Sequence, residues 1–222
     1  MLVVITKKLP SSQLDSLKSI GCEYDVIESL EIIPLEINRP QEADVWILSS
    51  RNSLLAIKEF VKQAPAQIYC IGKWMENELK STNIQSHVQS FDNMKSLAAD
   101  LRNKKISRLL YFCGDHHREE LSQALVGSPS LLTKVITHES HLTYPILKKK
   151  YNAVFVFSPR SIESLLQNNS FTNETIFACI GPTTVSYLHQ RGLNNTFCAS
   201  SPDSEILLHE FFEKYKKPPI TH

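Results

Sequence analysis

The sequence contains an internal repeat, and this repeat limits the folds that the chain can adopt. Residues 46–57 return as residues 155–166 at a displacement of 109, with Ser49 aligned on Ser158. Two shorter matches, at displacements of 109 and 107, pair residues 71–73 with 180–182 and residues 2–6 with 109–113. Each copy has an apolar run, then polar residues, then an amphipathic stretch, which indicates a buried parallel strand followed by a helix. Ligands of open α/β sheets bind at the carboxyl ends of strands, so the repeat predicts two such edges, which can face each other across a cleft.

Size and charge narrow the class of protein. The chain has 222 residues, enough for one large domain or for two of about 110 residues, and the repeat favours two. The formal net charge is +1, from 24 basic and 23 acidic residues, so we expect no nucleic-acid or membrane partner. Residues 1–8 lack the pattern of a signal peptide, and no apolar stretch approaches the ~20 residues of a membrane span. We therefore expect a cytoplasmic protein.

Cysteine usage argues against disulfides. The number of cysteines, five, is odd. All but Cys22 fall in predicted strands, where a reduced cysteine behaves as a small hydrophobe. We expect neither disulfides nor a thiolate metal site.

Apolar runs predict ten strands, five in each half of the chain. They are residues 2–6, 24–27, 45–49, 68–71, 87–90, 108–113, 133–137, 153–157, 176–180 and 196–199. Helices are predicted between them: Pro10–Ser12 opens the first, Gly21 closes it, and Asp203 opens the last. This alternation predicts an α/β fold of flavodoxin-like, doubly wound parallel sheets flanked by helices.

Two segments do not turn into a helix after their strand. Residues 31–37 and 138–146 continue the apolar pattern, which indicates crossovers between two lobes. The first two strands of each repeat then join the sheet formed by the last three strands of the other. This interpretation predicts a discontinuous first lobe and an inserted second lobe, namely residues 1–35 with 147–222, and residues 38–144. A simple split near residue 104 is the alternative.

Three blocks of the sequence resemble the uroporphyrinogen-III synthase family, and the resemblance runs thinly along the whole chain. The most specific block is Ile-Gly-Pro-Thr-Thr at residues 180–184, followed by Leu188 and Gly192. The others are Phe-Val-Phe-Ser-Pro-Arg at residues 155–160 and Pro-Leu-Glu-Ile at residues 34–37. The resemblance implies two flavodoxin-like lobes, the first discontinuous, joined by a two-stranded crossover ladder.

The resemblance also implies a reaction. Members of the family close the linear tetrapyrrole hydroxymethylbilane in haem biosynthesis, with loss of water and inversion of the terminal pyrrole ring through a spiro intermediate. It further implies a monomer without a cofactor, which has at most transient contact with the enzyme that forms the bilane. Such an enzyme mainly holds the substrate's ends in a rarely visited geometry, which fits a sequence without a Ser-His-Asp or Cys-His signature.

The chain departs from the family pattern at its few polar contacts. His138 stands where the family has a tyrosine, and Ser140 where it has a threonine. Met75 replaces a threonine after the first glycine-containing loop, and Ser50 replaces a common proline. These departures favour an alternative function, a catalytically weakened two-lobed protein that binds a tetrapyrrole or another anion.

The leading candidate site residues lie at predicted strand ends. Thr184 is the first catalytic candidate. With Gly181 and Thr183, it lies at the start of a helix whose free N–H groups and hydroxyls can receive substrate carboxylates. Three serines can also hydrogen-bond a carboxylate without the cost of burying a charge. They are Ser49, Ser50 and Ser158. Helix capping is the alternative role for Thr184 and for these serines.

His138 is the second catalytic candidate, as a proton donor to the leaving hydroxyl. Its reference pKa of about 6.5 suits proton transfer near neutrality. The alternative is a surface histidine on an exposed ladder. His141 and Tyr144 lie further along the same crossover, and they rank lower because each requires a shifted alignment.

Basic residues after predicted strands are candidates for binding the substrate's carboxylates, because a guanidinium pairs with a carboxylate through two hydrogen bonds. They are Arg51, Lys73, Arg118 and Arg160. A merely solvated side chain is the alternative for each. His116 and His117 suggest a metal ligand pair, but adjacent histidines seldom converge on one ion, so no metal is expected.

A nucleotide- or flavin-binding protein is a third candidate function, suggested by the flavodoxin-like lobes. The chain has only six glycines, and none forms a G-x-G-x-x-G motif or a P-loop. Similarity of fold alone does not support this function.

Overall fold

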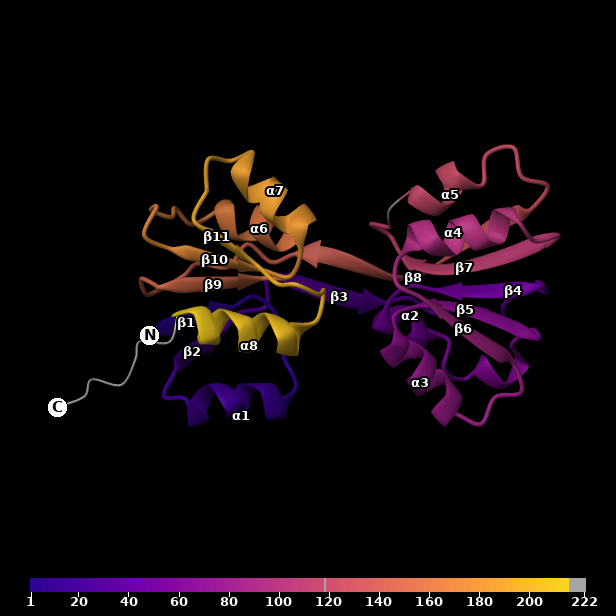
Figure 1. Cartoon of the computed structure of the whole chain (residues 1–222), viewed down its shortest axis with the longest axis horizontal. Helices are drawn as coiled ribbons and strands as arrows, with labels where there is room; N and C mark the ends of the chain where they lie inside the picture. Colours follow the sequence, from indigo (N-terminus) through magenta and orange to yellow (C-terminus); the bar gives the residue numbers. More distant parts are fainter. Residues whose placement is uncertain (118, 216–222) are drawn as a thin grey trace. The chain divides into compact units, whose positions relative to one another are not determined.

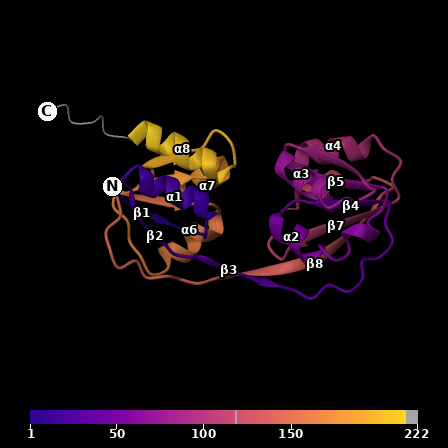
Figure 2. The same cartoon turned by 90° about the horizontal axis from the view of Figure 1, so that it is seen from below.

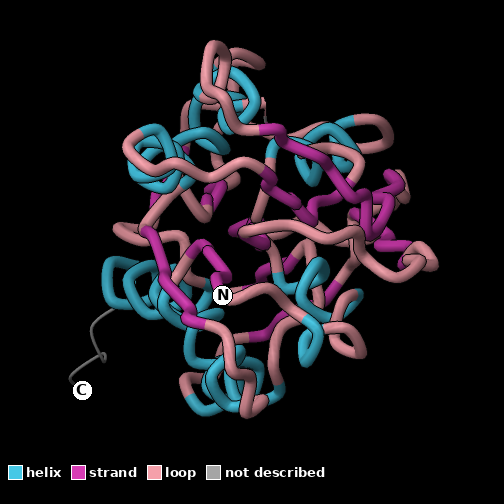
Figure 3. Tube along the Cα trace, turned by 90° about the vertical axis from the view of Figure 1, so that its right-hand side faces the viewer, coloured by secondary structure: helices cyan, strands magenta, loops and turns pink. Residues whose placement is uncertain are grey.

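The computed structural model describes residues 1–117 and 119–215, which form helices and strands joined by loops (Figure 3). The chain forms two compact units. Unit 1 combines Met1–Glu31 with the described residues from His141 onward, and unit 2 is Ile32–Ser140. Among the described helices, none has the length and apolar character needed to cross a membrane.

Unit 1 is built on a five-stranded parallel sheet in the order β11-β10-β9-β1-β2 (Figure 1). Its strands are β1 (Leu2–Ile5), β2 (Glu23–Val26), β9 (Ala153–Val156), β10 (Ile176–Cys179) and β11 (Thr196–Cys198). Its helices are α1 (Ser11–Ser19), α6 (Pro159–Leu166), α7 (Pro182–His189) and α8 (Ser204–Tyr215). Helices α1 and α8 cover one face and α6 and α7 the other, so the central strands β1 and β9 are apolar and almost fully buried.

Unit 2 is built on a six-stranded sheet in the order β3-β8-β7-β4-β5-β6, which is parallel from β8 to β6 (Figure 2). Its strands are β3 (Leu30–Pro34), β4 (Val45–Leu48), β5 (Gln67–Ile71), β6 (His87–Phe91), β7 (Arg108–Gly114) and β8 (Leu131–Leu142). Its helices are α2 (Arg51–Ala56), a 3-10 turn (Val61–Gln63), α3 (Lys73–Ser81), α4 (Met94–Arg102) and α5 (Glu120–Ala124). One core lies under α2 and α3, and a second lies under α4 and α5.

Helix ends follow the local signals in the sequence. Gly21 lies just past α1 with φ +69°, a left-handed conformation that glycine adopts without steric cost. The carboxylate of Asp203 accepts hydrogen bonds from the backbone N–H groups of Glu205, at 2.7 Å, and Ile206, at 3.2 Å. These bonds satisfy two N–H groups that have no partner within α8.

The α/β architecture of two parallel-dominated sheets flanked by helices confirms the predicted fold class. All ten predicted strands are present, within a few residues of their predicted bounds. The two crossover segments are themselves extended: residues 30–34 form β3, and β8 continues to Leu142. The hydrogen bond from the N–H of Leu35 to the carbonyl of Thr137, at 3.0 Å, lies where these segments run together. Each sheet thus contains strands from both halves of the sequence.

Candidate functional site

A cavity of about 380 Å³ opens where β4, β5, β6 and β7 end, beside His138 and Ser140 of β8, entirely within unit 2. In a parallel sheet the strand ends on this edge are followed by loops that carry polar groups, which is the usual place for a ligand. The polar residues that line the cavity are Ser49, Ser50, Asp92, Asn93, Tyr111, Asp115, His116, His117, Glu120, His138 and Ser140.

Two serines after β4 lie at the cavity, but they have different partners. Ser49 Oγ lies 2.9 Å from the hydroxyl of Tyr111, and burial raises the pKa of that tyrosine. Ser50 is the N-cap of α2: its Oγ accepts a hydrogen bond from the N–H of Ser53 at 3.1 Å. Ser50 thus caps α2 from the cavity wall, whereas Ser49 contacts the phenol of Tyr111.

His138 lies on β8 and lines the same cavity, with 9% of its surface exposed. Its ring lies against Gly114, where an added Cβ would come within 2.6 Å of Nε2. The register of β7 and β8 shifts between Cys113 and Gly114, which places His138 opposite Gly114. Burial lowers the pKa of His138, and the nearby charge of Asp115 opposes this effect. His138 is thus a buried, largely neutral imidazole rather than a surface histidine.

Asp115 ties the end of β7 to β8. Its Oδ1 accepts hydrogen bonds from the backbone N–H groups of His116, at 2.8 Å, and Ser140, at 3.1 Å. Its own N–H donates to the carbonyl of His138 at 3.0 Å. Two of these hydrogen bonds join Asp115 to β8 at His138 and Ser140, and the third orders the loop after β7.

His116 and His117, the adjacent histidines after β7, each have a partner within unit 2. His116 lies 3.4 Å from the carboxylate of Asp115. His117 Nδ1 lies 2.9 Å from the carbonyl of Gly114, and its ring packs edge-on against Tyr111. Within residues 1–117 and 119–215, no group of three or more His, Cys, Asp or Glu side chains is placed to hold a metal ion.

Unit 1 carries a second polar edge, formed after the neighbouring strands β9 and β10. Ser158 is the N-cap of α6, and its Oγ accepts from the N–H of Ser161 at 3.1 Å. Gly181 occupies the N-cap position of α7, and no side chain caps that helix. Thr184 lies in the first turn and is 2% exposed, whereas Thr183 is exposed. Ser158 thus caps α6, and Thr184 does not occupy the N-cap position of α7, while the ligand role of both hydroxyls stays a prediction.

The predicted carboxylate-binding side chains that the structure describes lie at the starts of three different helices. Arg51 is exposed at the start of α2. Lys73 Nζ pairs with the carboxylate of Glu76, on its own helix, at 2.7 Å. Arg160 is half-buried in the first turn of α6, and Arg118 lies outside the described residues. Among the described residues that line the unit 2 cavity, none is a lysine or arginine.

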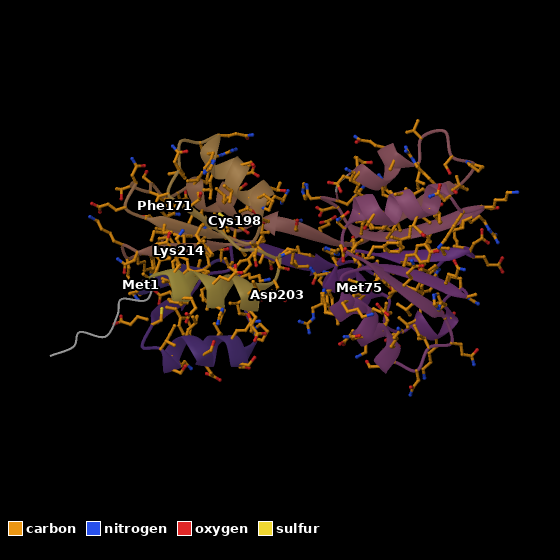
Figure 4. All side chains as sticks on the ribbon, in the orientation of Figure 1. Met1, Met75, Phe171, Cys198, Asp203 and Lys214 are labelled. Atoms are coloured by element: carbon orange, nitrogen blue, oxygen red, sulfur yellow. The ribbon has the colours of Figure 1, made fainter. Side chains whose placement is uncertain are left out.

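Three residues singled out by the family resemblance occupy unexpected places. Met75 is fully buried on α3, in the core under that helix (Figure 4), so it lines no polar cavity. Tyr144, whose φ is +51°, belongs to unit 1 and is 45% exposed. Asn168 and Ser164 hold the backbone of Tyr144 through hydrogen bonds of 2.7 and 2.9 Å. His141 is exposed.

Tyr111, Asp115 and Gly114 are parts of the cavity that sequence reasoning missed. Tyr111 lies in the middle of the continuous buried run 109–113 of β7, so it has the pattern of a core residue. The dipeptide Gly114-Asp115 directly after a predicted strand was the available signal, because such positions lie at the ligand-binding edge of a parallel sheet. The contact between Gly114 and His138 depends on strand pairing, which the sequence pattern does not show.

The fold and these polar strand ends define a class: a two-unit α/β protein with parallel sheets whose candidate site residues lie at the carboxyl edges. The sequence profile of the family Uroporphyrinogen-III synthase HemD matches residues 15–209, and the chain belongs to this family. A small-molecule tetrapyrrole substrate and a place in tetrapyrrole biosynthesis go with the family. A search of curated protein sequences finds no significant match.

Solved structures share the fold. The chain is similar to uroporphyrinogen-III synthetase from Helicobacter pylori 26695, with a TM-score of 0.66, 17% identity and coverage of 96% of this chain and 98% of that one. It is also similar to a mutant uroporphyrinogen III synthase from the extremely thermophilic bacterium Thermus thermophilus, with a TM-score of 0.64, 12% identity and the same coverage. At these identities the likeness establishes the two-lobed fold and not the chemistry.

Proposed function

We propose that this protein is a uroporphyrinogen-III synthase that cyclises hydroxymethylbilane, with loss of water and inversion of the terminal pyrrole ring. The observation that carries the proposal is the family match over residues 15–209. We further propose that it works as a cytoplasmic monomer without a cofactor, as the family resemblance implies. In this class the hydroxyl of one end ring leaves as water, and the far ring is attacked at its substituted carbon to give a spiro intermediate.

The protein's contribution is mainly conformational. The bilane closes unaided to the uninverted isomer, so the enzyme must hold its ends in the geometry that leads to inversion. The polar groups at the two carboxyl edges suit this task, because hydroxyls and helix N-termini hydrogen-bond carboxylates without burying a compensating charge. We assign this role to Ser49 in unit 2 and to Thr183 and Thr184 in unit 1.

His138 is the proposed proton-exchanging group. It is the one histidine on β8 whose ring both lines the cavity and is held by neighbouring groups. Its lowered pKa leaves it neutral near pH 7, so it can accept a proton from the substrate without first losing one to water.

A binding protein on the same scaffold is the second candidate function. Two observations favour it: His138 replaces the family tyrosine, and Met75, which replaces the family threonine, is buried in a core. Such a protein holds a tetrapyrrole and does not convert it.

The test is to supply hydroxymethylbilane to the purified protein, oxidise the products and separate the uroporphyrin isomers by chromatography. Isomer III in excess over the protein-free blank is the expected result. If isomer I alone forms while the protein still binds the bilane, the enzyme proposal fails and the binding function replaces it.

A further inference from the structure

A chain of buried hydroxyl groups ends at the His138 ring. Thr137 precedes His138 on β8 and is fully buried. Its Oγ1 lies 2.8 Å from His138 Nδ1 and 3.1 Å from the carbonyl oxygen of Cys113. The same Oγ1 lies 3.2 Å from Ser53 Oγ, which lies 2.8 Å from Ser50 Oγ at the cavity wall.

Proton counting at Thr137 decides which nitrogen of His138 carries the hydrogen. The hydroxyl of Thr137 has one proton, and the carbonyl of Cys113 can only accept. If the proton pointed at His138 Nδ1, two oxygens with lone pairs would face each other at 3.1 Å in a buried site. The proton therefore goes to one of the two oxygens that the hydroxyl faces, the carbonyl of Cys113 at 3.1 Å or Ser53 Oγ at 3.2 Å, and Thr137 Oγ1 accepts from His138 Nδ1–H.

With the hydrogen on Nδ1, a neutral imidazole has a lone pair on Nε2. His138 Nε2 lies over Gly114, which also lines the cavity, and no described residue is hydrogen-bonded to it. The cavity side of the ring is thus an acceptor. The sequence had suggested a proton donor at this position. The hydrogen bond to the neighbouring Thr137 instead makes the cavity-facing nitrogen of His138 an acceptor.

We propose that Thr137 is a positioning residue that fixes His138 in the Nδ1–H tautomer, so that Nε2 accepts a hydrogen bond from a pyrrole N–H of the substrate. The hydrogen bond to a pyrrole N–H rests on the proposed function, whereas the tautomer of His138 does not. A linear tetrapyrrole supplies N–H donors, whereas its carboxylates would be repelled by the same lone pair. The pairing therefore selects the pyrrole face of the substrate over its acidic side chains at this point of the cavity.

The tautomer is measured directly by two-bond ¹H–¹⁵N correlation spectra of the full-length, ¹⁵N-labelled protein, at a pH well above about 6.5. The His138 signals are assigned by their absence in His138→Asn. We expect the Nδ1–H pattern in the wild type and in Thr137→Ser, which keeps the hydroxyl. In Thr137→Val, which keeps the shape, we expect a mixture of tautomers. An Nε2–H pattern in the wild type overturns the proposal. A Thr137→Val spectrum identical to that of the wild type overturns it as well.

Catalysis supplies the second readout. In the isomer assay, Thr137→Val should lower kcat/KM roughly tenfold, the effect of misdirecting one hydrogen bond, while Thr137→Ser restores most of it. An equal loss in both variants contradicts the positioning role. Because the spectra need no substrate, failure of the tautomer assignment is separate from failure of the synthase assay.

Discussion

The chemistry of single residues in this protein depends on their immediate hydrogen-bond partners. Ser49 and Ser50 are adjacent, yet one contacts Tyr111 and the other caps α2. The first-turn threonine of α7, Thr184, is buried and does not cap its helix. Residue type alone does not separate these roles, because a hydroxyl can satisfy a helix end or a ligand equally well.

Thr184 provides a test of a ligand role. Thr184→Val keeps the shape of the buried side chain and removes the hydroxyl, whereas Thr184→Ser keeps the hydroxyl. We expect Thr184→Val to lower kcat/KM about 10- to 100-fold, the range for a hydrogen bond to a charged group, with a melting temperature near that of wild type. Thr184→Ser should stay close to wild type in turnover. Unchanged turnover in Thr184→Val would remove this residue from the site.

His138 makes stability depend on pH. Burial holds its pKa below the unfolded value of about 6.5, so the unfolded chain takes up a proton first as the pH falls. The stabilisation is therefore fully present above about pH 6.5 and is lost as the pH falls through the lower folded pKa. Urea denaturation between about pH 8 and 5 should show a steeper loss of unfolding free energy in wild type than in His138→Phe. Parallel curves for the two proteins would contradict this account.

Among the secondary-structure elements, helix caps show how the repeated sequence is used. Ser50 and Ser158 each cap a helix and contact a serine three residues later, Ser53 or Ser161. The structural displacement at these caps is thus 108 residues, one fewer than the alignment of Ser49 on Ser158. The sequence alignment pairs identical serine and arginine residues, whereas the capping hydrogen bonds make Ser50 the structural equivalent of Ser158.

Removing one cap tests this equivalence. Ser158→Ala should lower the free energy of unfolding by about 1 kcal/mol, the usual cost of losing an N-cap, and Ser158→Asp should restore most of it. Chemical denaturation monitored by circular dichroism measures both. Ser49→Ala is the matched control in unit 2, where the residue does not cap. An effect on stability at Ser49 as large as at Ser158 would argue against the assignment.

The pairing of β7 with β8 has its own test. Gly114→Ala adds one methyl group where the His138 ring lies, and the ring must move because the added Cβ would be 2.6 Å from Nε2. We expect isomer III formation to fall at least about tenfold, in keeping with the sensitivity of catalysis to small misplacements of a reacting group. The far-ultraviolet circular dichroism spectrum should be retained. The double variant Gly114→Ala/His138→Phe should then be no worse than His138→Phe alone, and additive losses would refute the link between the two residues.

At the scale of the whole molecule, the strands that form each sheet determine which fragments of the chain contain a complete sheet. The sheet of unit 2 uses strands from residues 30 to 142, while the sheet of unit 1 draws on both ends of the chain. Each of the four cores lies between one face of a sheet and its pair of helices. A piece that lacks neighbouring strands leaves such a core open to water.

Two fragments test the division into these units against a simple split of the chain near residue 104. Residues 30–142 contain the complete sheet of unit 2 and should unfold cooperatively in urea. Residues 1–104 end before β7 and contain incomplete parts of both sheets, so we expect no cooperative transition. Circular dichroism during a urea titration distinguishes them. Cooperative unfolding of the shorter, amino-terminal fragment would contradict the division into these units.

Local signals in the chain specify the strands and helices of this protein, whereas long-range pairing specifies how they are combined. Apolar runs, Gly21 and Asp203 are such local signals, so the strands and helix ends were predictable without any partner. The extension of β8 and the contact between Gly114 and His138 were not, because strand register depends on residues that are distant in sequence. The proton on His138 is decided by Thr137, and that role exists because β7 brings the carbonyl of Cys113, and α2 brings Ser53, beside it.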